Sequence, residues 1–443
     1  MIQSMQHSNI QQQSALGLST FLPPHLARWL VWEQALLLAL TACFWGVYLA
    51  RQTSVVGFGY SRDFLGVYVG ARAVATGRGS QLYDVQVQRT LMNSAILPYR
   101  RGKLMPFTYP AYVAVLFRPL GGLAFGTALP TWVFINLAMA LWIAIRLSYF
   151  FSGNLPGRFA TLVTFFAWVP LQLTVFHGQL GILPTVGIIQ ALVSLRSGHD
   201  WRAGWWLSLG LLKPQLVLFP LLVFIIWRCW RTVLAFFITL TGILGISIAA
   251  IGFWIAKYVH FLAEYNRLGA ELSLYPGAMQ NWRGLVCSLL KTDHGLAFRS
   301  VLLVLSVISI LVVIFICFPS SSYRSSNLDL TFSPAPQREA RYATAVLLGL
   351  LSSPHLYMHD WVVALPAGLV LWSFARESYS NPNSKKCCAV ALIWLLGLAP
   401  VVFFAAQFWS ELRPIQLVPV YVAVVVAVAA LILGTFRGLP QPK

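Results

Sequence analysis

Residues 297–317 read AFRSVLLVLSVISILVVIFIC, and Arg299 is the only charged residue in that stretch. A run of about 20 apolar residues is enough for an α-helix to cross the hydrocarbon core of a bilayer. Residues 129–148 and 232–254 are apolar runs of similar length. Helices that are apolar on every side cannot all be buried in one soluble core. These stretches therefore predict an all-α membrane protein.

The composition of the whole chain supports this prediction. Of 443 residues, 58% are hydrophobic and 10% are charged, and the mean hydropathy is +0.72. A soluble domain carries about 25% charged residues. The formal net charge is +19. Two interpretations of that charge stay open: contact with anionic lipid headgroups, and recognition of a phosphate-bearing lipid substrate. Nucleic-acid binding is not expected, because no soluble basic domain is present.

Shorter apolar runs raise the expected number of transmembrane helices to about 12, within a range of roughly 10–13. All the runs lie at 29–50, 129–148, 158–176, 180–196, 202–213, 215–228, 232–254, 297–317, 342–353, 360–375, 387–407 and 414–436. One transmembrane domain is therefore expected over residues 29–436. It is expected to lie between a disordered tail at 1–28 and a short tail at 437–443.

Basic residues recur in one alternating set of short loops. This set carries Arg146, Arg158, Arg196, Arg202, Arg228, Arg231, Arg324, Arg341, Arg376, Lys386, Arg437 and Lys443. Short cytoplasmic loops are enriched in Lys and Arg. We therefore expect a multi-pass plasma-membrane protein with both termini in the cytoplasm. The long loops 51–128 and 255–297 would then face outward, together with most of the acidic residues and histidines.

The first long loop is expected to be ordered. Its residues 63–72 have small and apolar side chains at helical spacing, which indicates an amphipathic helix on the membrane surface. Residues 111–125 indicate a second interfacial or re-entrant helix. Asp63 begins the first of these helices. It is either an acid that favours the helix N-terminus or a general base that takes a proton from an acceptor sugar hydroxyl.

Polar residues also interrupt the apolar runs further along the chain. His177 and Gln179 form either a simple turn or part of a site, and Lys213 either reaches the interface or pairs with a phosphate. Residues 352–360, SSPHLYMHD, are the densest polar cluster, with His355 and His359 four residues apart. Phosphate or sugar contact and helix capping are both possible there. From the second long loop, Gln280 and Arg283 are candidates to contact the same substrate.

Several signatures of other chemistry are missing from the sequence. No Asp-x-Asp occurs, although paired acids usually bind the divalent cation that bridges a nucleotide diphosphate. The pair of histidines is not part of a His-Glu-x-x-His pattern, and no Walker A or Gly-x-Ser-x-Gly occurs. We therefore expect no metal site, no cofactor and no nucleotide-sugar donor.

The order of these segments resembles glycosyltransferase family 87. The segments are Asp-Phe-x-x-x-Tyr at 63–68, Leu-Tyr-Asp at 82–84, Thr-Tyr-Pro at 108–110, Gly-Gln at 178–179, Leu-Lys-Pro at 212–214 and Ser-Pro-His to His-Asp at 353–360. Two positions depart from the family pattern. Ala111 stands where a second proline often follows Tyr-Pro, and Leu180 follows Gly-Gln.

This resemblance implies a bundle of the GT-C type and an inverting mannosyl transfer. The donor would be a polyprenyl-phosphate sugar, and the acceptor a glycolipid or glycan on the outer face. Asp63 would be the catalytic base, and Lys213 with Arg283 or His355 would stabilise the departing phosphate. The residues implied to bind substrate are Tyr68, Tyr109, His177, Gln179, Lys213, Gln280, Arg283, His355, His359 and Asp360.

Two other functions remain open at this point. A flippase or transporter of lipid-linked saccharides would show paired halves and charges in mid-helix. The chain has no internal repeat, and its charges lie at helix ends. A polymerase resembling the O-antigen ligases would not need an acid close to the first span.

Overall fold

The computed structural model describes residues 29, 32–43, 63–98, 102–151, 155–272, 274–318, 335–377, 398–405, 424–425 and 428. Every regular element in these ranges is an α-helix or a 3-10 helix. The two expected tails, and most of the runs expected at 387–407 and 414–436, lie outside the described residues.

Three described helices are long and apolar enough to cross a membrane, and a bent pair makes a possible fourth. The three are α7 (Phe125–Phe151), α13 (Trp230–Ile251) and α16 (Leu296–Cys317). The bent pair is α8 (Leu155–Ala167) and α9 (Val169–His177), which meet at an angle of 57°. The all-helical membrane fold is confirmed in this form, and the count of about 12 spans stays a prediction.

The remaining apolar runs form shorter helices in the same bundle. These are α10 (Ile182–Arg196), α11 (Asp200–Leu207), η3 (Ser208–Leu212), η4 (Pro214–Leu216), α12 (Leu218–Ile226), α17 (Ala335–Ser352), η8 (Met358–Val363), α18 (Ala364–Glu377) and α20 (Ala399–Ala405). The expected break at Lys213-Pro214 lies between η3 and η4, because proline cannot continue the hydrogen bonding of a helix.

The two long loops are helical as well. The first contains α3 (Phe64–Ala75), η2 (Gly79–Gln81), α4 (Val85–Ala95), α5 (Ala111–Leu116) and α6 (Arg118–Gly121). The second contains α14 (Ile255–Leu268), η5 (Gly269–Leu272), η6 (Pro276–Ala278) and α15 (Trp282–Leu290).

Helix α3 differs from the surface helix expected at 63–72. Residues 64–71 are all buried, so the helix lies inside the protein rather than presenting one apolar face. It packs on α6 at Gly121, where a Cβ would lie 2.3 Å from the carbonyl carbon of Ala71. Only glycine permits this approach, because any side chain would overlap the α3 backbone. The start of α3 lies beside the bundle, because the Phe64 ring stacks on Trp132 of α7.

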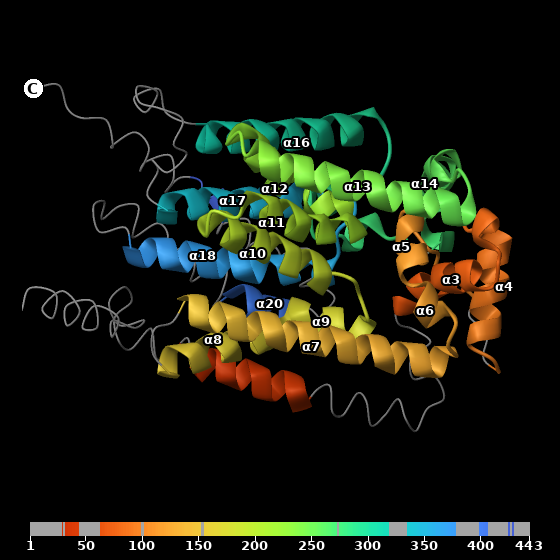
Figure 1. Ribbon diagram of the computed structural model, residues 1–443, viewed down its shortest axis with the longest axis horizontal. Helices are drawn as coiled ribbons and strands as arrows, with labels where there is room; N and C mark the ends of the chain where they lie inside the picture. The colour runs from red at the N-terminus through yellow and green to blue at the C-terminus, as the bar shows by residue number, and fades with distance from the viewer. Residues whose placement is uncertain are drawn as a thin grey trace, which may run out of the picture.

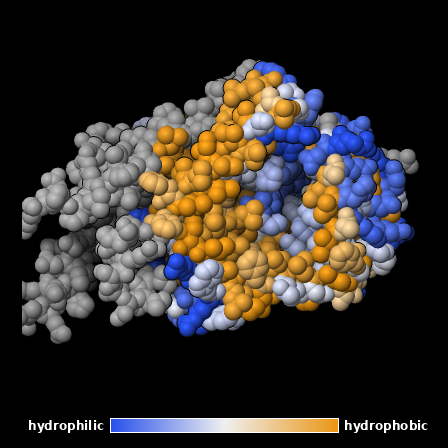
Figure 2. Space-filling model, turned by 90° about the horizontal axis from the view of Figure 1, so that it is seen from above, coloured by the Kyte–Doolittle hydropathy of each residue, from blue (hydrophilic) through white to orange (hydrophobic). Residues whose placement is uncertain are grey.

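Figure 1 shows the long helices running side by side, with α3 to α6 and α14 gathered at one end. We call this the site end. The helices turn back at the other end, at Arg146, Arg196, Arg202, Arg228 and Arg338, which we call the arginine end. Figure 2 shows hydrophobic residues over the middle of the molecule and hydrophilic residues at the site end. This separation is expected when the middle faces lipid.

Candidate active site

Asp63 immediately precedes α3, but its side chain does not cap that helix. Its Oδ2 atom instead accepts a hydrogen bond from Nε2 of Gln179 at 2.6 Å. The Asp63 side chain is 28% exposed, so solvent or a substrate can still reach it. A carboxylate that is held on one oxygen and open to the surroundings is suited to accept a proton.

Gln179 is positioned by the break between α9 and α10. Gly178 ends α9 with φ of 65°, in the left-handed region that favours glycine. A Cβ at Gly178 would also lie 2.8 Å from Cβ of Phe64. The carbonyl of Gly178 accepts from the indole of Trp132 at 2.8 Å, and the carbonyl of Gln179 accepts from Asn136 at 3.3 Å. Helix α7 therefore holds this turn against the start of α3.

Lys213 reaches the other side of the Gln179 amide. Its Nζ donates to Oε1 of Gln179 at 2.9 Å and to Oδ1 of Asp360 at 2.5 Å. The side chains of Lys213 and Asp360 are 5% and 1% exposed. Two charges buried this deeply are tolerated because each has an opposite charge and further hydrogen bonds. Lys213 is thus engaged within the protein.

Asp360 also organises the Ser-Pro-His segment. Its Oδ2 accepts from the backbone nitrogen of Tyr357 at 3.2 Å, which forms a capping box at the start of η8. The same oxygen lies 3.5 Å from Nε2 of His359. One carboxylate therefore joins Lys213 to the turn that carries His359.

Two histidines flank the Asp63 carboxylate. Nδ1 of His177 and Nδ1 of His359 each lie 3.9 Å from Oδ2 of Asp63, and the two rings are 6.5 Å apart. These separations are longer than a hydrogen bond. The carbonyl of His359 accepts from Thr174 on α9 at 2.6 Å, which fixes the η8 turn beside the end of α9. We call Asp63, His177, Gln179, Lys213, His359 and Asp360 the polar cluster.

Tyr109 joins this cluster, but Tyr68 does not. The hydroxyl of Tyr109 donates to Oε1 of Gln179 at 3.2 Å. The backbone carbonyl of Tyr109 accepts from the hydroxyl of Tyr83 at 2.9 Å. The hydroxyl of Tyr68 donates to the carbonyl of Leu123 at 2.8 Å, and its ring packs on Phe125. Tyr68 therefore contributes to the packing of α3 against the start of α7.

Gln280, Arg283 and His355 lie around the Ser-Pro-His segment. The Gln280 backbone donates to the carbonyl of Leu356 at 2.8 Å and accepts from the Trp361 indole at 2.9 Å. Arg283 donates to Oδ1 of Asn266 at 3.3 Å and to the carbonyl of Pro354 at 3.5 Å. Gln280 is buried, and Arg283 has no carboxylate partner among the described residues.

His355 lies among aromatic side chains. Its ring centroid is 5.0 Å from that of Tyr357 and 6.3 Å from that of Tyr265. Burial in these surroundings lowers the pKa of His355 to about 4, because it disfavours the charged imidazolium. His355 is therefore neutral near pH 7, where it can form hydrogen bonds but brings no positive charge to a phosphate.

Sequence reasoning missed several residues that support the cluster. Thr174, Trp132 and Asn136 hold the α9–α10 turn, and Asn281 donates to the carbonyl of Ser353 at 2.6 Å. Two of the supporting residues had a local signal: Tyr357 sits between the two histidines of its segment, and Asn281 lies between Gln280 and Arg283. Thr174, Trp132 and Asn136 are ordinary residues on helices and become recognisable only through their contacts.

Within the described ranges, no three His, Cys, Asp or Glu side chains are arranged to hold a metal ion. Cys43, Cys229, Cys287 and Cys317 are free thiols, and Cys387-Cys388 lies outside the described residues. The chemistry of the polar cluster is that of two carboxylates, one ammonium, two imidazoles and an amide that links them.

Comparison with known proteins gives a consistent result. The pattern of glycosyltransferase family 87 matches residues 107–333, just over half of the chain. A relative from Mycobacterium tuberculosis is 27% identical over 325 residues, which cover 69% of this chain and 68% of the relative. A relative from Mycolicibacterium smegmatis is 28% identical over 368 residues, 79% of each chain. Both are named polyprenol-phosphate-mannose-dependent alpha-(1-2)-phosphatidylinositol pentamannoside mannosyltransferase. No solved structure matches the chain.

Proposed function

The chain belongs to glycosyltransferase family 87, and from this premise we propose that it transfers a mannosyl group from a polyprenyl-phosphate donor to a glycolipid acceptor. As a glycosyltransferase it is an enzyme rather than a transporter. The names of the two relatives support mannose as the sugar and a phosphatidylinositol mannoside as the class of acceptor.

The proposal rests on the hydrogen bonding of the Asp63 carboxylate. Its Oδ2 is held by Gln179, and no hydrogen bond engages its Oδ1 in the described part of the chain. In the proposed reaction the acceptor hydroxyl oxygen attacks the anomeric carbon and gives its proton to Asp63. The bond from the anomeric carbon to the phosphate oxygen breaks, and the phosphate leaves with the electron pair. Attack opposite to the leaving group inverts the anomeric configuration.

The roles of the cations follow from their partners. Lys213 is bound to Asp360 and Gln179, so we propose that it positions the amide that holds Asp63. Arg283 donates only to uncharged acceptors in the described residues, which supports it as the group that meets the departing phosphate. A guanidinium suits this task because its planar set of donors matches phosphate oxygens.

The assay that tests the proposal uses the purified full chain with polyprenyl-phosphate-mannose and phosphatidylinositol mannosides. We expect mannose transfer with inverted configuration, measured by NMR of the product. Asp63→Asn should lower kcat about 1,000-fold, in the range that a positioned general base contributes.

Asp84→Asn is the matched control. Asp84 lies in the same loop, caps α4 through hydrogen bonds to Gln86 and Val87, and has no contact with the cluster. Asn also caps helices well, so activity should be retained. Full activity of Asp63→Asn would exclude Asp63 as the base, and transfer of a different sugar by the wild type would replace mannose in the proposal.

We further propose that the site end faces outward. Arginines gather at the opposite end, and basic residues are enriched on the cytoplasmic side of membrane proteins. Single cysteines at Asp84 and Arg202, introduced after the native cysteines are replaced, test this in intact cells. A membrane-impermeant thiol reagent should label position 84 only, and labelling of position 202 alone would reverse the orientation.

A further inference from the structure

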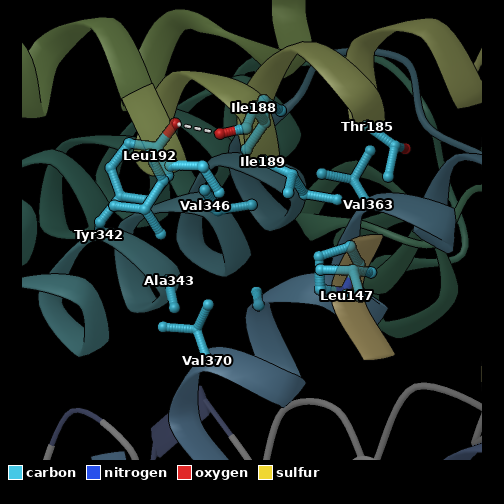
Figure 3. A pocket seen from close by; sticks show the side chains of 13 residues that line it. Leu147, Thr185, Ile188, Ile189, Leu192, Tyr342, Ala343, Val346, Val363 and Val370 are labelled. Atoms are coloured by element: carbon cyan, nitrogen blue, oxygen red, sulfur yellow. Dashed lines mark hydrogen bonds between the residues drawn. The ribbon is translucent and has the colours of Figure 1, made fainter. Parts of the chain in front are cut away.

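Two neighbouring hollows lie toward the arginine end, away from the polar cluster. The first is a narrow apolar cavity between α7, α10, α17 and α18, partly open to the surroundings. Figure 3 shows aliphatic side chains such as Ile188, Leu192 and Val370 around it. The hydroxyl of Tyr342 donates to the carbonyl of Ile188 at 3.1 Å, and that of Thr185 donates to Gly181. These polar atoms are satisfied, so the cavity offers an occupant apolar contact.

The second hollow has both polar and apolar side chains around it. It is open to the surface and is lined by Arg146, Leu147, Tyr149, Ile189, Gln190 and Val193. Three of these side chains, Leu147, Ile189 and Val193, also line the apolar cavity. The two hollows therefore adjoin, and one occupant can place a polar group in one and a chain in the other.

Gln190 is the sharpest indication that this hollow receives a ligand. The residue is 5% exposed, and its Nε2 has no hydrogen-bond acceptor among the described residues. A buried amide without a partner is costly, typically about 1–3 kcal/mol. Such groups are normally satisfied by a protein atom, a water or a ligand. A ligand with an oxygen acceptor at this position would relieve that cost.

Arg146 supplies a charge at the same place. The described residues provide no carboxylate within ion-pair distance of its guanidinium. Arg146 and Tyr149 are the last turn of the candidate span Phe125–Tyr149, which is the level of lipid headgroups. A ligand suited to this place would have three features. It would offer an acceptor oxygen to Gln190, a negative charge to Arg146 and an apolar chain to the cavity.

We propose that this pair of hollows binds an anionic phospholipid, with its phosphate at Arg146 and Gln190 and the first part of an acyl chain against the apolar cavity. The site is separate from the polar cluster and does not depend on the reaction catalysed there. Binding here would brace α7 against α10, and α10 begins at Ile182, three residues after Gln179. A lipid at this position therefore supports the helix that follows the amide holding Asp63.

The test uses the purified full chain after delipidation, titrated with dioleoyl phosphatidylglycerol or dioleoyl phosphatidylcholine. Native mass spectrometry measures the bound lipid, and the melting temperature reports its effect. We expect saturable binding of phosphatidylglycerol, with Arg146→Gln and Gln190→Leu each weakening the affinity about tenfold, as expected for a lost charge-assisted hydrogen bond. Arg202→Gln is the matched control, because Arg202 is an exposed arginine at the same end that lines neither hollow.

A substitution in the apolar cavity tests the contribution of the acyl chain and leaves Arg146 and Gln190 unchanged. Ala367→Leu narrows the cavity and should weaken binding of the acyl chain. The melting temperature of this variant without lipid measures its effect on the fold. Equal binding of the two lipids, or equal affinity of Arg146→Gln, Gln190→Leu and Arg202→Gln, would overturn the proposal and leave a water as the partner of Gln190.

Discussion

The two ends of the bundle each contain a buried acid paired with a base, but the pairs differ in how much water reaches them. At the site end, Lys213 and Asp360 are 5% and 1% exposed. At the arginine end, Arg196 lies 3.4 Å from Glu339, and their side chains are 42% and 5% exposed. Solvent screens the second pair on one side, whereas the first depends on its own partners. The pair at the site end is therefore held by its partners within the protein, whereas the pair at the arginine end also meets its surroundings through Arg196.

The largest expected effect comes from breaking the buried pair. Lys213→Met leaves Asp360 charged without its partner and should lower the free energy of unfolding by about 3 kcal/mol. Arg196→Gln should cost less than about 1 kcal/mol. Unfolding in mixed micelles with increasing SDS measures both.

The double variant Lys213→Met/Asp360→Leu separates stability from catalysis. Removing both charges should recover most of the stability that Lys213→Met loses, because no buried charge is left unpaired. Mannosyl transfer should remain low, since Gln179 is no longer held by an ammonium. Equal costs for Lys213→Met and Arg196→Gln would contradict the distinction between the two ends.

A smaller effect on activity is expected from substitutions of Gln179, whose side-chain amide accepts from Lys213 and donates to Asp63. Gln179→Leu removes every hydrogen bond of the side chain and should lower kcat about 10- to 100-fold, with little change in KM. Gln179→Glu keeps an acceptor for Lys213 and Tyr109 but removes the donor to Asp63. It should lose at least as much activity as Gln179→Leu. Wild-type kcat in Gln179→Glu would show that the donor to Asp63 is unimportant.

The smallest expected effect is on the pH dependence of stability, through His355 at the site end. The folded protein lowers the pKa of His355 from 6.5 to about 4, so between these values the unfolded chain binds more protons than the folded one. Stability therefore falls as the pH drops from 6.5 toward 4. His355→Gln should lose about 2–4 °C less in melting temperature over this range than the wild type. Arg202→Gln leaves His355 and its surroundings unchanged, so this variant should behave as the wild type.

Several features of the site were predictable because they interrupt a strong local pattern. Gln179, Lys213 and the segment ending at Asp360 are polar breaks in apolar sequence, and hydrogen bonds join them in one cluster. The burial of α3 was not predictable in this way. Its small residues fit a surface helix equally well until α6 packs against it at Gly121.

A local sequence pattern also does not predict which way an individual side chain points. Tyr68 and Tyr109 both belong to motifs of the family resemblance, but Tyr68 packs α3 against the start of α7, whereas the hydroxyl of Tyr109 reaches Gln179. The partner of Lys213 is 147 positions away, and that of Asp63 is 116 away. No periodicity encodes such pairings, because they depend on how helices pack in three dimensions.

The amino-acid sequence by itself determined that this chain is a helical membrane protein, where its polar breaks fall, and which family it resembles. These properties follow from hydropathy and from the order of short motifs along the chain. Only the tertiary structure decided that Lys213 faces Asp360 and Gln179, that Asp63 accepts from Gln179 on one oxygen, and that the buried Gln190 amide lies at the opposite end without an acceptor among the described residues. The physical reason is that burial and pairing are properties of packed helices, which bring together residues that the chain keeps far apart.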